Sequence, residues 1–549
     1  MSPRPFAAAV LTGALAVTGA LGSGADAAPT TTPALAYDVS GNGYRDLLVG
    51  APGDSNGNGN IYVGLGTSTG FRAGQSLYRR AQVLVSADFN SDGYADVASS
   101  DVSGSGVYID YGPPRHPALR SEDITARRTH STADATGAVT DDSGFGYGWS
   151  LAAGDFNHDG YADLAIGHPY TTVEPIDVSG GPTGPNGTGG AGVVLVRYGS
   201  ATGLDNSENL SPGHYEEWND RSANVDGGVG GNDHFGYAVT SGDLNGDGID
   251  DLVVGIPGKT VGDIQAAGAV TELFGTTAGL SATGNATFSL ATPGVKGEPA
   301  QQQDCDEDDG CELEGENFGA SLATGDIDDD GFGDVAIGTP DKAVVAGAHD
   351  TDGNPGHDGS LSVLFGAPTG MTARSQYITY NTPGVPGSIP AQGAGFDRFA
   401  NELVMADFNG DGHADVAAAG IVNKADGGCG CDGVLVFRGN DTRLRSHHVH
   451  QLSGAPLQRG DTVISGIGQS MLAIDLDNDR HDDLVAGAPG AFVAGASGAG
   501  AVVLFRGGKG GLVQSRSRLL TERRPFGGSN SEDNQFGWVG TQNSFITGD

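Results

Sequence analysis

The sequence predicts an all-β fold, a seven-bladed β-propeller with four antiparallel strands per blade and a ring closed by its N- and C-terminal segments. Three observations predict it. A nine-residue acidic pattern occurs seven times, starting at residues 38, 88, 155, 243, 326, 407 and 475. A short apolar run of strand character follows each copy. The chain has 95 glycines and only 7% aromatic residues, as expected for many short strands and turns.

Each copy of the acidic pattern has Asp or Asn, once Ser, at its first, third, fifth and ninth positions. Calcium takes about six to eight oxygen ligands, and alternate side chains of a tight loop converge on one point while the seventh residue offers its carbonyl oxygen. The sixth position is Gly in six copies, which suits a sharp turn with positive φ. The last acid comes at the ninth position, whereas an EF-hand has its Glu at the twelfth. The spacing therefore predicts up to seven calcium ions in loops unlike the EF-hand.

The candidate calcium ligands are the four oxygen-bearing side chains of each copy. They are Asp38, Ser40, Asn42, Asp46; Asp88, Asn90, Asp92, Asp96; Asp155, Asn157, Asp159, Asp163; Asp243, Asn245, Asp247, Asp251; Asp326, Asp328, Asp330, Asp334; Asp407, Asn409, Asp411, Asp415; and Asp475, Asp477, Asp479, Asp483. The first copy has only two carboxylates, so we expect it to bind calcium least tightly or to stay empty. The seventh has Arg480 where Gly is expected. A solvated Asn, Asp and Gly turn is the alternative for any single copy, and seven copies in register disfavour it.

The segments around each acidic loop predict the strands of one blade. In the fourth repeat, Phe235-Gly236 precedes a strand that ends at Gly242, and the apolar run 251–257 follows the loop. Gly and Pro end this run, as they commonly end strands. A third strand is predicted at 268–275 and an outer strand at 285–290. The acidic loop therefore connects the first strand of a blade to the second.

The order Phe-Gly, acidic loop, Gly-Ala-Pro (Gly50-Ala51-Pro52, for example) resembles the FG-GAP repeat of the integrin α-subunit N-terminal propeller and of related bacterial secreted proteins. The resemblance covers residues 34–549. It implies a seven-bladed propeller with calcium between strands one and two of a blade and ligand recognition on the opposite face. Two repeats depart from the pattern, because 99–101 reads Ser-Ser-Asp and 418–420 reads Ala-Ala-Gly.

The N-terminus predicts export. Arg4 precedes an apolar stretch at 6–21, and Ala25-Asp26-Ala27 fits a small-residue cleavage site, so residues 1–27 are predicted to be a signal peptide and 28–549 the propeller. A membrane anchor is the alternative, but the stretch is short and contains Gly. The net charge of −40 argues against nucleic acid as a partner. We expect a secreted, extracellular monomer with no membrane span.

Four cysteines form two local pairs, Cys305 with Cys311 and Cys429 with Cys431. In an exported chain, an even number of close cysteines predicts disulfide bonds. A zinc site is the alternative, but the spacings do not match the usual zinc ligand pairs and no His is adjacent. A bridge between Cys429 and Cys431 would close a very small, strained ring.

In a four-stranded meander, the turns between strands one and two and between three and four share one face. The long insertions therefore lie on the other face, at 168–191, 211–234, 292–317, 341–358, 381–398, 421–432 and 521–535. Variable loops on a rigid scaffold commonly carry binding, which predicts an adhesion or ligand-binding module for a protein or a glycan. The alternative is an extracellular hydrolase or polysaccharide lyase, for which His214, Tyr215, Trp218 and Arg221 are the nearest basic and aromatic cluster. No catalytic residue and no organic cofactor is assigned.

The two ends of the chain predict how the ring closes. Little mature sequence precedes the first acidic loop, so blade one lacks its own Phe-Gly and first strand. Phe536-Gly537 and 544–549 repeat the pattern of Phe318-Gly319 and 321–326. We expect the C-terminal segment to pair with blade one and to remove its open edge.

Overall fold

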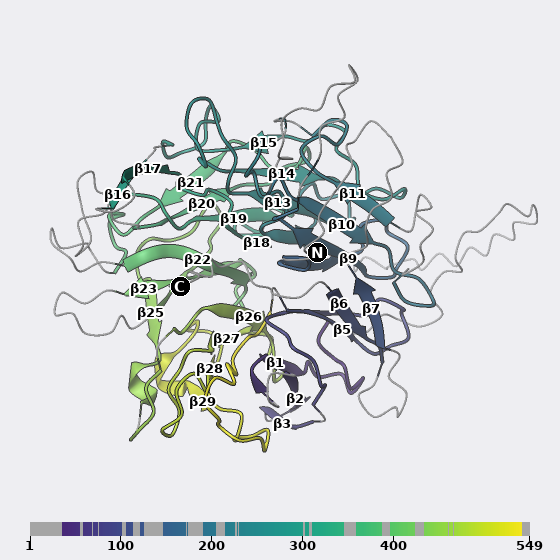
Figure 1. The fold of residues 1–549 in the computed structure, drawn as a ribbon, viewed down its shortest axis with the longest axis vertical. Helices are drawn as coiled ribbons and strands as arrows, with labels where there is room; N and C mark the ends of the chain where they lie inside the picture. Colours follow the sequence, from purple (N-terminus) through teal and green to yellow (C-terminus); the bar gives the residue numbers. More distant parts are fainter. Residues whose placement is uncertain are drawn as a thin grey trace, which may run out of the picture.

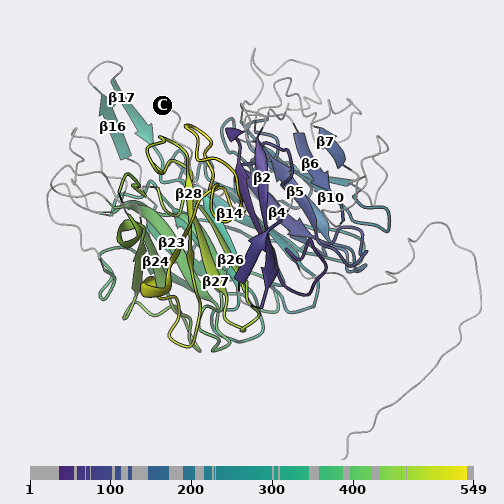
Figure 2. The ribbon, with the colours of Figure 1, turned by 90° about the horizontal axis from the view of Figure 1, so that it is seen from below.

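The computed structural model describes residues 36–540 apart from several connecting segments, the longest of which are 126–145, 174–189, 345–357, 205–214 and 423–432. Seven antiparallel sheets stand around a central axis as the blades of a propeller (Figure 1). Figure 2 shows the same ring from the side. The fold class predicted from the sequence is confirmed.

Six blades have four strands in chain order. They comprise β4 (Val83–Ala87), β5 (Asp96–Ser100), β6 (Gly106–Asp110) and β7 (Ser121–Thr125); β8 (Leu151–Gly154), β9 (Asp163–His168), β10 (Val193–Arg197) and β11 (Tyr215–Trp218); β12 (Val239–Gly242), β13 (Asp251–Ile256), β14 (Ala269–Leu273) and β15 (Thr287–Phe288); β18 (Ser321–Gly325), β19 (Asp334–Thr339), β20 (Ser360–Leu364) and β21 (Ser375–Ile378); β22 (Phe396–Ala406), β23 (Asp415–Val422), β24 (Gly433–Phe437) and β25 (His450–Ser453); and β26 (Ser470–Ile474), β27 (Asp483–Ala488), β28 (Ala501–Phe505) and β29 (Arg518–Leu520). Blade one has β1 (Leu47–Ala51), β2 (Asn60–Thr67) and β3 (Gly70–Ala73). A hairpin of β16 (Gln302–Asp306) and β17 (Gly310–Glu314) lies between blades four and five in the chain.

The apolar second strands form the core because each blade is covered on both faces by its neighbours. In β13, Leu252 and Val254 pack in one cluster with Val194 of blade three. The intervening Val253 packs in another cluster with Ile337 of blade five. Alternate side chains of a strand point to opposite faces, so a continuous apolar run fills both interfaces between blades.

At the interfaces between blades, the Gly of a Gly-x-Pro segment lies against the Phe-Gly segment of the next blade. A Cβ atom on Gly255 would lie 2.1 Å from the carbonyl oxygen of Gly319 in the next blade. Gly319 has φ +94°, and its N–H donates to the Gly338 carbonyl oxygen at 3.1 Å. The same approach recurs where Gly338 faces the Ala400 carbonyl oxygen. The glycines are therefore needed because neighbouring backbones pass too closely for a side chain.

The C-terminal segment closes the ring, as predicted. The N–H of Gly50 in β1 donates to the Trp538 carbonyl oxygen at 2.7 Å, and the N–H of Gly537 donates back to the Gly50 carbonyl oxygen at 3.0 Å. Phe536 is fully buried. Blade one thus has three strands and this bridge, while residues 541–549 lie outside the described residues.

One expectation about the loops is wrong. Tyr215 and Trp218 lie on β11, the outer strand of blade three, and not in a loop of the predicted ligand-binding face. β11 pairs with β10, where the Arg197 guanidinium lies 4.5 Å from the centre of the Tyr215 ring. Aromatic residues favour such half-buried strands. Arg221 lies in the turn after the strand, and His214 lies outside the described residues.

Candidate metal centres

Six of the acidic loops each join the first strand of a blade to the second. The loop at 38–46 directly precedes β1 of blade one. We number them loops one to seven, at 38–46, 88–96, 155–163, 243–251, 326–334, 407–415 and 475–483. The strand order places them on one face of the ring, called here the metal-loop face. The opposite face, called the upper face, carries the connections between strands two and three and between blades. Figure 2 shows the β16–β17 hairpin standing out from the upper face.

Backbone amides hold the first and ninth carboxylates of the loops in a repeated arrangement. In loop five, Asp326 accepts the N–H of Asp330 at 3.1 Å and the N–H of Gly331 at 2.8 Å. Asp334 accepts the N–H of Ile327 at 2.9 Å and, from the turn between strands three and four, the N–H of Gly366 at 2.9 Å. A carboxylate oxygen can accept more than one contact, so these bonds orient the oxygens without exhausting them.

The position-six residue has the conformation that the sequence predicted. Gly331 has φ +88°, and the corresponding Arg480 of loop seven adopts φ +69°. A positive φ is unfavourable for a residue with a Cβ, so loop seven carries backbone strain that the glycine loops avoid. The N–H of Arg480 nevertheless donates to Asp475 at 3.0 Å, as Gly331 does to Asp326.

Two loops gather three carboxylates around one point. The ligand oxygens of Asp326, Asp328 and Asp334 in loop five lie within 4.8 Å of one another, as do those of Asp475, Asp477 and Asp479 in loop seven. Within the described part of the chain, no other group of three or more acidic, His or Cys side chains is gathered so tightly. The remaining predicted ligands lie in their loops at the expected positions but are less convergent.

Loop five fits a divalent cation. The Asp328 side chain is only 4% exposed, and its Oδ1 atom is buried without a hydrogen-bond partner. A buried carboxylate oxygen without a partner is unfavourable unless a cation or donor satisfies it. Oxygen-only, carboxylate-rich sites suit hard cations such as calcium. Asp326, Asp328 and Asp334 are the residues that would hold the ion.

The ninth-position carboxyls resist ionisation. Burial, with a smaller contribution from neighbouring Asp residues, raises the pKa of Asp334 to about 7 and that of Asp251 to about 7. The same causes raise the pKa of Asp96 to about 8. A bound divalent cation would favour the ionised form of these groups and offset both effects.

Position three is Ser or Asn in every loop except five and seven, and in loops one and six this residue donates closely to the ninth carboxylate. In loop one the backbone N–H of Ser40 donates to Asp46 at 2.9 Å. In loop six the Asn409 amide donates to Asp415 at 3.1 Å. In both loops a neutral donor thus occupies the ninth carboxylate. Loop one, with only two carboxylates, remains the weakest candidate calcium site.

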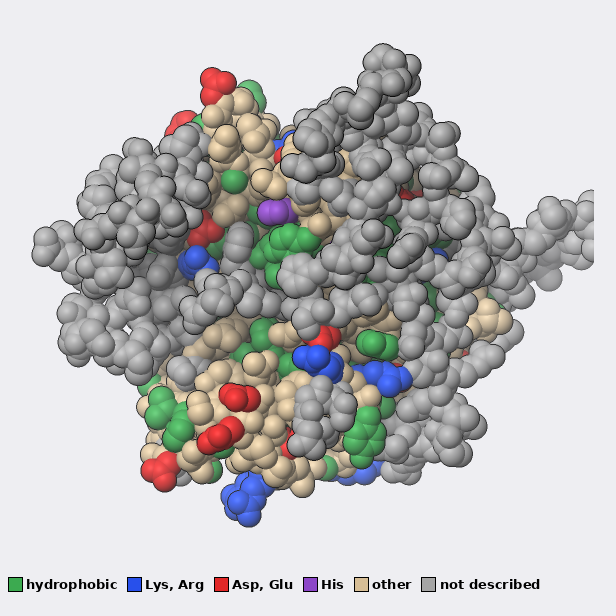
Figure 3. All heavy atoms as spheres, in the orientation of Figure 1, with side chains coloured by type: hydrophobic (Ala, Val, Ile, Leu, Met, Phe, Trp, Pro, Cys, Tyr) green, Lys and Arg blue, Asp and Glu red, His purple; other side chains and the backbone are tan. Residues whose placement is uncertain are grey.

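The upper face contains buried charges and aromatic groups that the sequence did not indicate. The Lys259 ammonium lies 2.5 Å from Asp220 and 2.9 Å from Asp233, and all three side chains are buried. The rings of Trp149 and Tyr170 meet edge to face at 5.0 Å. Acidic, basic and apolar side chains are interspersed on this face (Figure 3). The Phe-Gly motif at 145–146, just before Trp149, was the sequence sign available for this aromatic contact.

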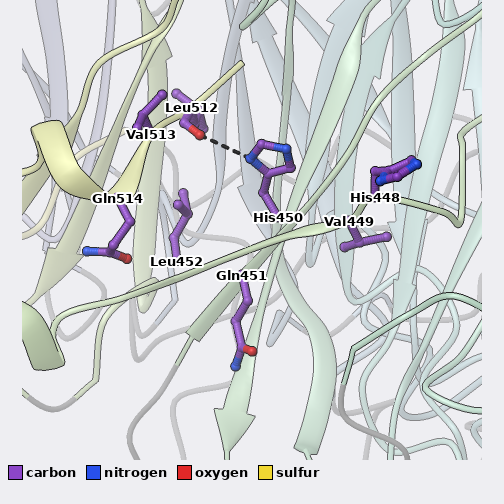
Figure 4. Close-up of a pocket in the computed structure, with 8 residues that line it drawn as sticks. All are labelled: His448, Val449, His450, Gln451, Leu452, Leu512, Val513 and Gln514. Atoms are coloured by element: carbon purple, nitrogen blue, oxygen red, sulfur yellow. Dashed lines mark hydrogen bonds between the residues drawn. The ribbon is translucent and has the colours of Figure 1, made fainter. Parts of the chain in front are cut away.

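A groove of about 400 Å³ lies between blades six and seven at their outer strands. It is lined by His448, Val449, His450, Gln451, Leu452, Leu512, Val513 and Gln514 (Figure 4). His450 Nδ1 is 3.2 Å from the Leu512 carbonyl oxygen, which holds the ring against the next blade. The lining includes two histidines but no acidic side chain, so it lacks the charged pair of a typical general acid and base.

The cysteine pairs differ in what can be described. The backbones of Cys305 and Cys311 lie directly opposite each other in the β16–β17 hairpin. This register is compatible with the predicted bridge. Cys429 and Cys431 lie outside the described residues.

Comparison with known proteins agrees with this geometry. The FG-GAP repeat family matches residues 30–63, 147–196, 235–273 and 467–505, which correspond to blades one, three, four and seven. Integrin alpha-PS2 of Drosophila melanogaster is 25% identical over 324 residues, 58% of this chain and 18% of its own length. Phosphatidylinositol-glycan-specific phospholipase D of Bos taurus is 29% identical over 228 residues, 41% of this chain and 24% of its own length. Integrin alpha-5 of Xenopus laevis is 26% identical over 300 residues, 54% of this chain and 21% of its own length.

The chain thus spans about a fifth to a quarter of the length of these relatives. The part of the chain described here contains no helix with the length and apolarity needed to cross a bilayer. The chain carries FG-GAP repeats on a seven-bladed β-propeller that resembles the N-terminal propeller of integrin alpha subunits.

Proposed function

We propose that the protein is a secreted, calcium-binding propeller that recognises an extracellular protein or glycan through the loops of its upper face. The observation that carries the calcium proposal is loop five, where three carboxylates converge and one buried oxygen of Asp328 has no hydrogen-bond partner. The first and ninth carboxylates of the other loops are held by equivalent backbone bonds, as in loop three by Gly160 and Gly199. Calcium would neutralise the acids and fix the loops, so its role is structural.

We assign ligand recognition to the upper face because its connections are long and stand on a scaffold of packed blades. Buried ion pairs such as Lys342 with Glu316 tie these connections to the blades. The relatives include integrin alpha chains and a phospholipase, and the chain spans only a minor part of each. A binding module is the function that this shared propeller supports best. The groove of Figure 4 and the residues of β11 provide no observation that favours the hydrolase or lyase alternative.

Export and disulfide bonding complete the proposal. Residues 1–27 would be removed as a signal peptide, leaving the propeller from residue 28, and Cys305 would be bridged to Cys311, with Cys429 bridged to Cys431. Intact-mass measurement of secreted protein before and after reduction tests both points. A mature N-terminus at Ala28 and a gain of mass on reduction are expected. Four free thiols in the secreted protein would contradict the disulfide proposal.

The binding proposal is tested by screening the purified protein on arrays of glycans and extracellular matrix proteins, with calcium and with EDTA. We expect ligands that are bound only with calcium and that are lost when an upper-face loop is exchanged for a short Gly-Ser turn. Exchange of residues 276–279 in a turn of the metal-loop face, which leaves Gly275 and its bond to Asp251 in place, is the matched control and should leave binding intact. Failure to bind any array component would remove the support for these ligand classes.

A further inference from the structure

Loop seven already contains a positively charged group. Arg506 follows β28, and its Nη1 atom lies 3.1 Å from Asp477 Oδ2 and directly contacts Asp483 Oδ2. These are the third and ninth candidate ligands of the loop. Asp477 Oδ1, like Asp328 Oδ1 of loop five, is buried without a hydrogen-bond partner, so the two loops differ in their ninth acid and not in this oxygen. The Arg506 side chain is 20% exposed and that of Asp483 is 2% exposed. Charge-assisted hydrogen bonds of this kind are among the strongest that a protein makes.

Arg506 occupies a place where most blades have an apolar or aromatic residue. The position directly precedes the Gly whose N–H donates to the ninth acid, and it is Leu65, Tyr111, Tyr198, Phe274, Phe365, Arg438 and Arg506 in blades one to seven. Arg438 of blade six turns elsewhere. Its Nη2 atom contacts the Gly510 carbonyl oxygen and lies 3.3 Å from His450 Nε2. An Arg at this position therefore enters the acidic loop only in blade seven.

One backbone bond to the ninth acid is longer in loop seven than in other loops. The N–H of Leu476 is 3.4 Å from Asp483 Oδ2, whereas the equivalent distances are 2.8 Å to Asp163 and 2.9 Å to Asp334. The carboxylate cluster of loop seven accordingly consists of positions one, three and five, while that of loop five includes the ninth acid. The last ligand that calcium needs thus faces Arg506 in loop seven.

Loop five differs at its ninth acid. Arg374 contacts Asp328 Oδ2 at 2.5 Å and lies 4.0 Å from Asp330. It also donates to the Thr442 carbonyl oxygen at 3.0 Å and lies 4.0 Å from the centre of the Phe365 ring. Asp334 is held by backbone amides alone, whereas Arg506 directly contacts the equivalent Asp483.

We propose that the Arg506 guanidinium is the resident cation of loop seven, so that this loop binds no calcium while loop five does. This inference rests on the proposed calcium function of the other loops. Calcium entering loop seven would have to expel a tethered cation and leave it beside a doubly charged ion, which electrostatic repulsion disfavours. The maximum of seven ions predicted from the sequence would then be reduced by one.

The test counts calcium ions per folded chain by native mass spectrometry and by equilibrium dialysis with elemental analysis. Arg506→Phe places in blade seven the residue that blades four and five already have, and it should increase the count by one relative to the wild type. Arg438→Phe is the matched control and should leave the count unchanged. In EDTA, Arg506→Phe should also melt below the wild type, because four loop-seven carboxylates then lack a cation.

A second pair of variants tests the proposal even if Arg506→Phe folds poorly. Asp477→Ala should leave the wild-type calcium count unchanged, whereas Asp328→Ala in loop five should reduce it by one. An unchanged count in Arg506→Phe, or a loss of one ion in Asp477→Ala, would overturn the inference while leaving the calcium function intact. A wild-type protein that holds no calcium would overturn both.

Discussion

The backbone N–H of Ala414 in loop six donates to the carbonyl oxygen of Asp326, the first residue of loop five, at 2.7 Å. The equivalent bond links the other neighbouring loops, from Ala95 to Asp38, Ala162 to Asp88, Asp250 to Asp155, Gly333 to Asp243 and Asp482 to Asp407, at 2.8 to 3.4 Å. Between loops seven and one, the Asn478 amide donates to the Gly43 carbonyl oxygen at 2.8 Å. The acidic loops therefore form a continuous hydrogen-bonded belt around the metal-loop face.

Because of this belt, we predict that the loss of one ion also loosens the adjacent loops. Asp328→Ala should increase backbone amide exchange in loop five and also in loops four and six, because each shares a backbone bond with loop five. Hydrogen–deuterium exchange in saturating calcium measures this directly. Loop two, on a distant part of the ring, is the internal control. An increase confined to 326–334 would show that the loops respond independently.

The number of carboxylates should set how much each loop contributes to stability. Replacing Asp326 or Asp330 by Ala in calcium should lower the melting temperature more than Ser40→Ala, since loop five has four carboxylates and loop one has two. A ligand that binds only the folded state stabilises it by about 2.7 kcal/mol at a hundredfold excess over its Kd, which gives the scale of the loss for one site at that excess. Equal losses in the two loops would contradict the dependence on acid count.

The raised pKa values predict an unusual pH dependence of the metal-free protein. Asp96, Asp251 and Asp334 hold protons in the folded state up to about pH 7 or 8, whereas their usual pKa is about 3.8. A raised folded-state pKa gives stability that is present at low pH and lost as the pH rises through the folded pKa. In EDTA the melting temperature should therefore fall between pH 5.5 and pH 8.

Calcium should weaken or reverse this trend, because protons and calcium compete for the same oxygens. The double variant Asp251→Asn, Asp334→Asn should show a flatter pH profile in EDTA than the parent. A melting temperature in EDTA that rises steadily with pH would refute the assignment of these buried carboxyls as the controlling groups.

Removal of residues 535–549 should open the ring. The deletion takes away the bonds between Gly50 and both Gly537 and Trp538, as well as the buried Phe536 ring beside Tyr62. It exposes an unpaired strand edge, which favours aggregation. Size-exclusion chromatography and limited proteolysis should show aggregated or protease-sensitive protein. A truncated chain that stays monomeric and melts like the parent would mean that the ring closes without this segment.

The sequence predicted the features that depend on local spacing. The loops at alternate acidic positions and the apolar second strands, such as 251–256, were predictable because ligand convergence and strand burial follow from residue order. The sequence showed the Gly255 and Gly319 motifs but not the reason for them, because the two glycines meet only when neighbouring blades pack together. The direction of a side chain at a shared position could not be predicted. Arg438 and Arg506 occupy equivalent positions, yet tertiary contacts turn only Arg506 into an acidic loop.

One further difference has the same origin. β11 was predicted as part of a long insertion, and its pairing with β10, where Arg197 and Tyr215 are partners across the sheet, joins residues that no local pattern relates. The bridge between Gly50 and Trp538, in contrast, agrees with the ring closure predicted from the Phe-Gly repeat at 536–537.

Thermal unfolding of the purified protein in excess calcium and in excess EDTA tests the central claim most directly. If calcium holds the acidic loops, EDTA should lower the melting temperature by several degrees, and adding calcium back beyond the chelator should restore it. Magnesium at the same concentration is the control and should restore less, because it requires a smaller and more regular octahedral site. An identical melting temperature in calcium and in EDTA, for protein shown to be free of metal, would contradict the account.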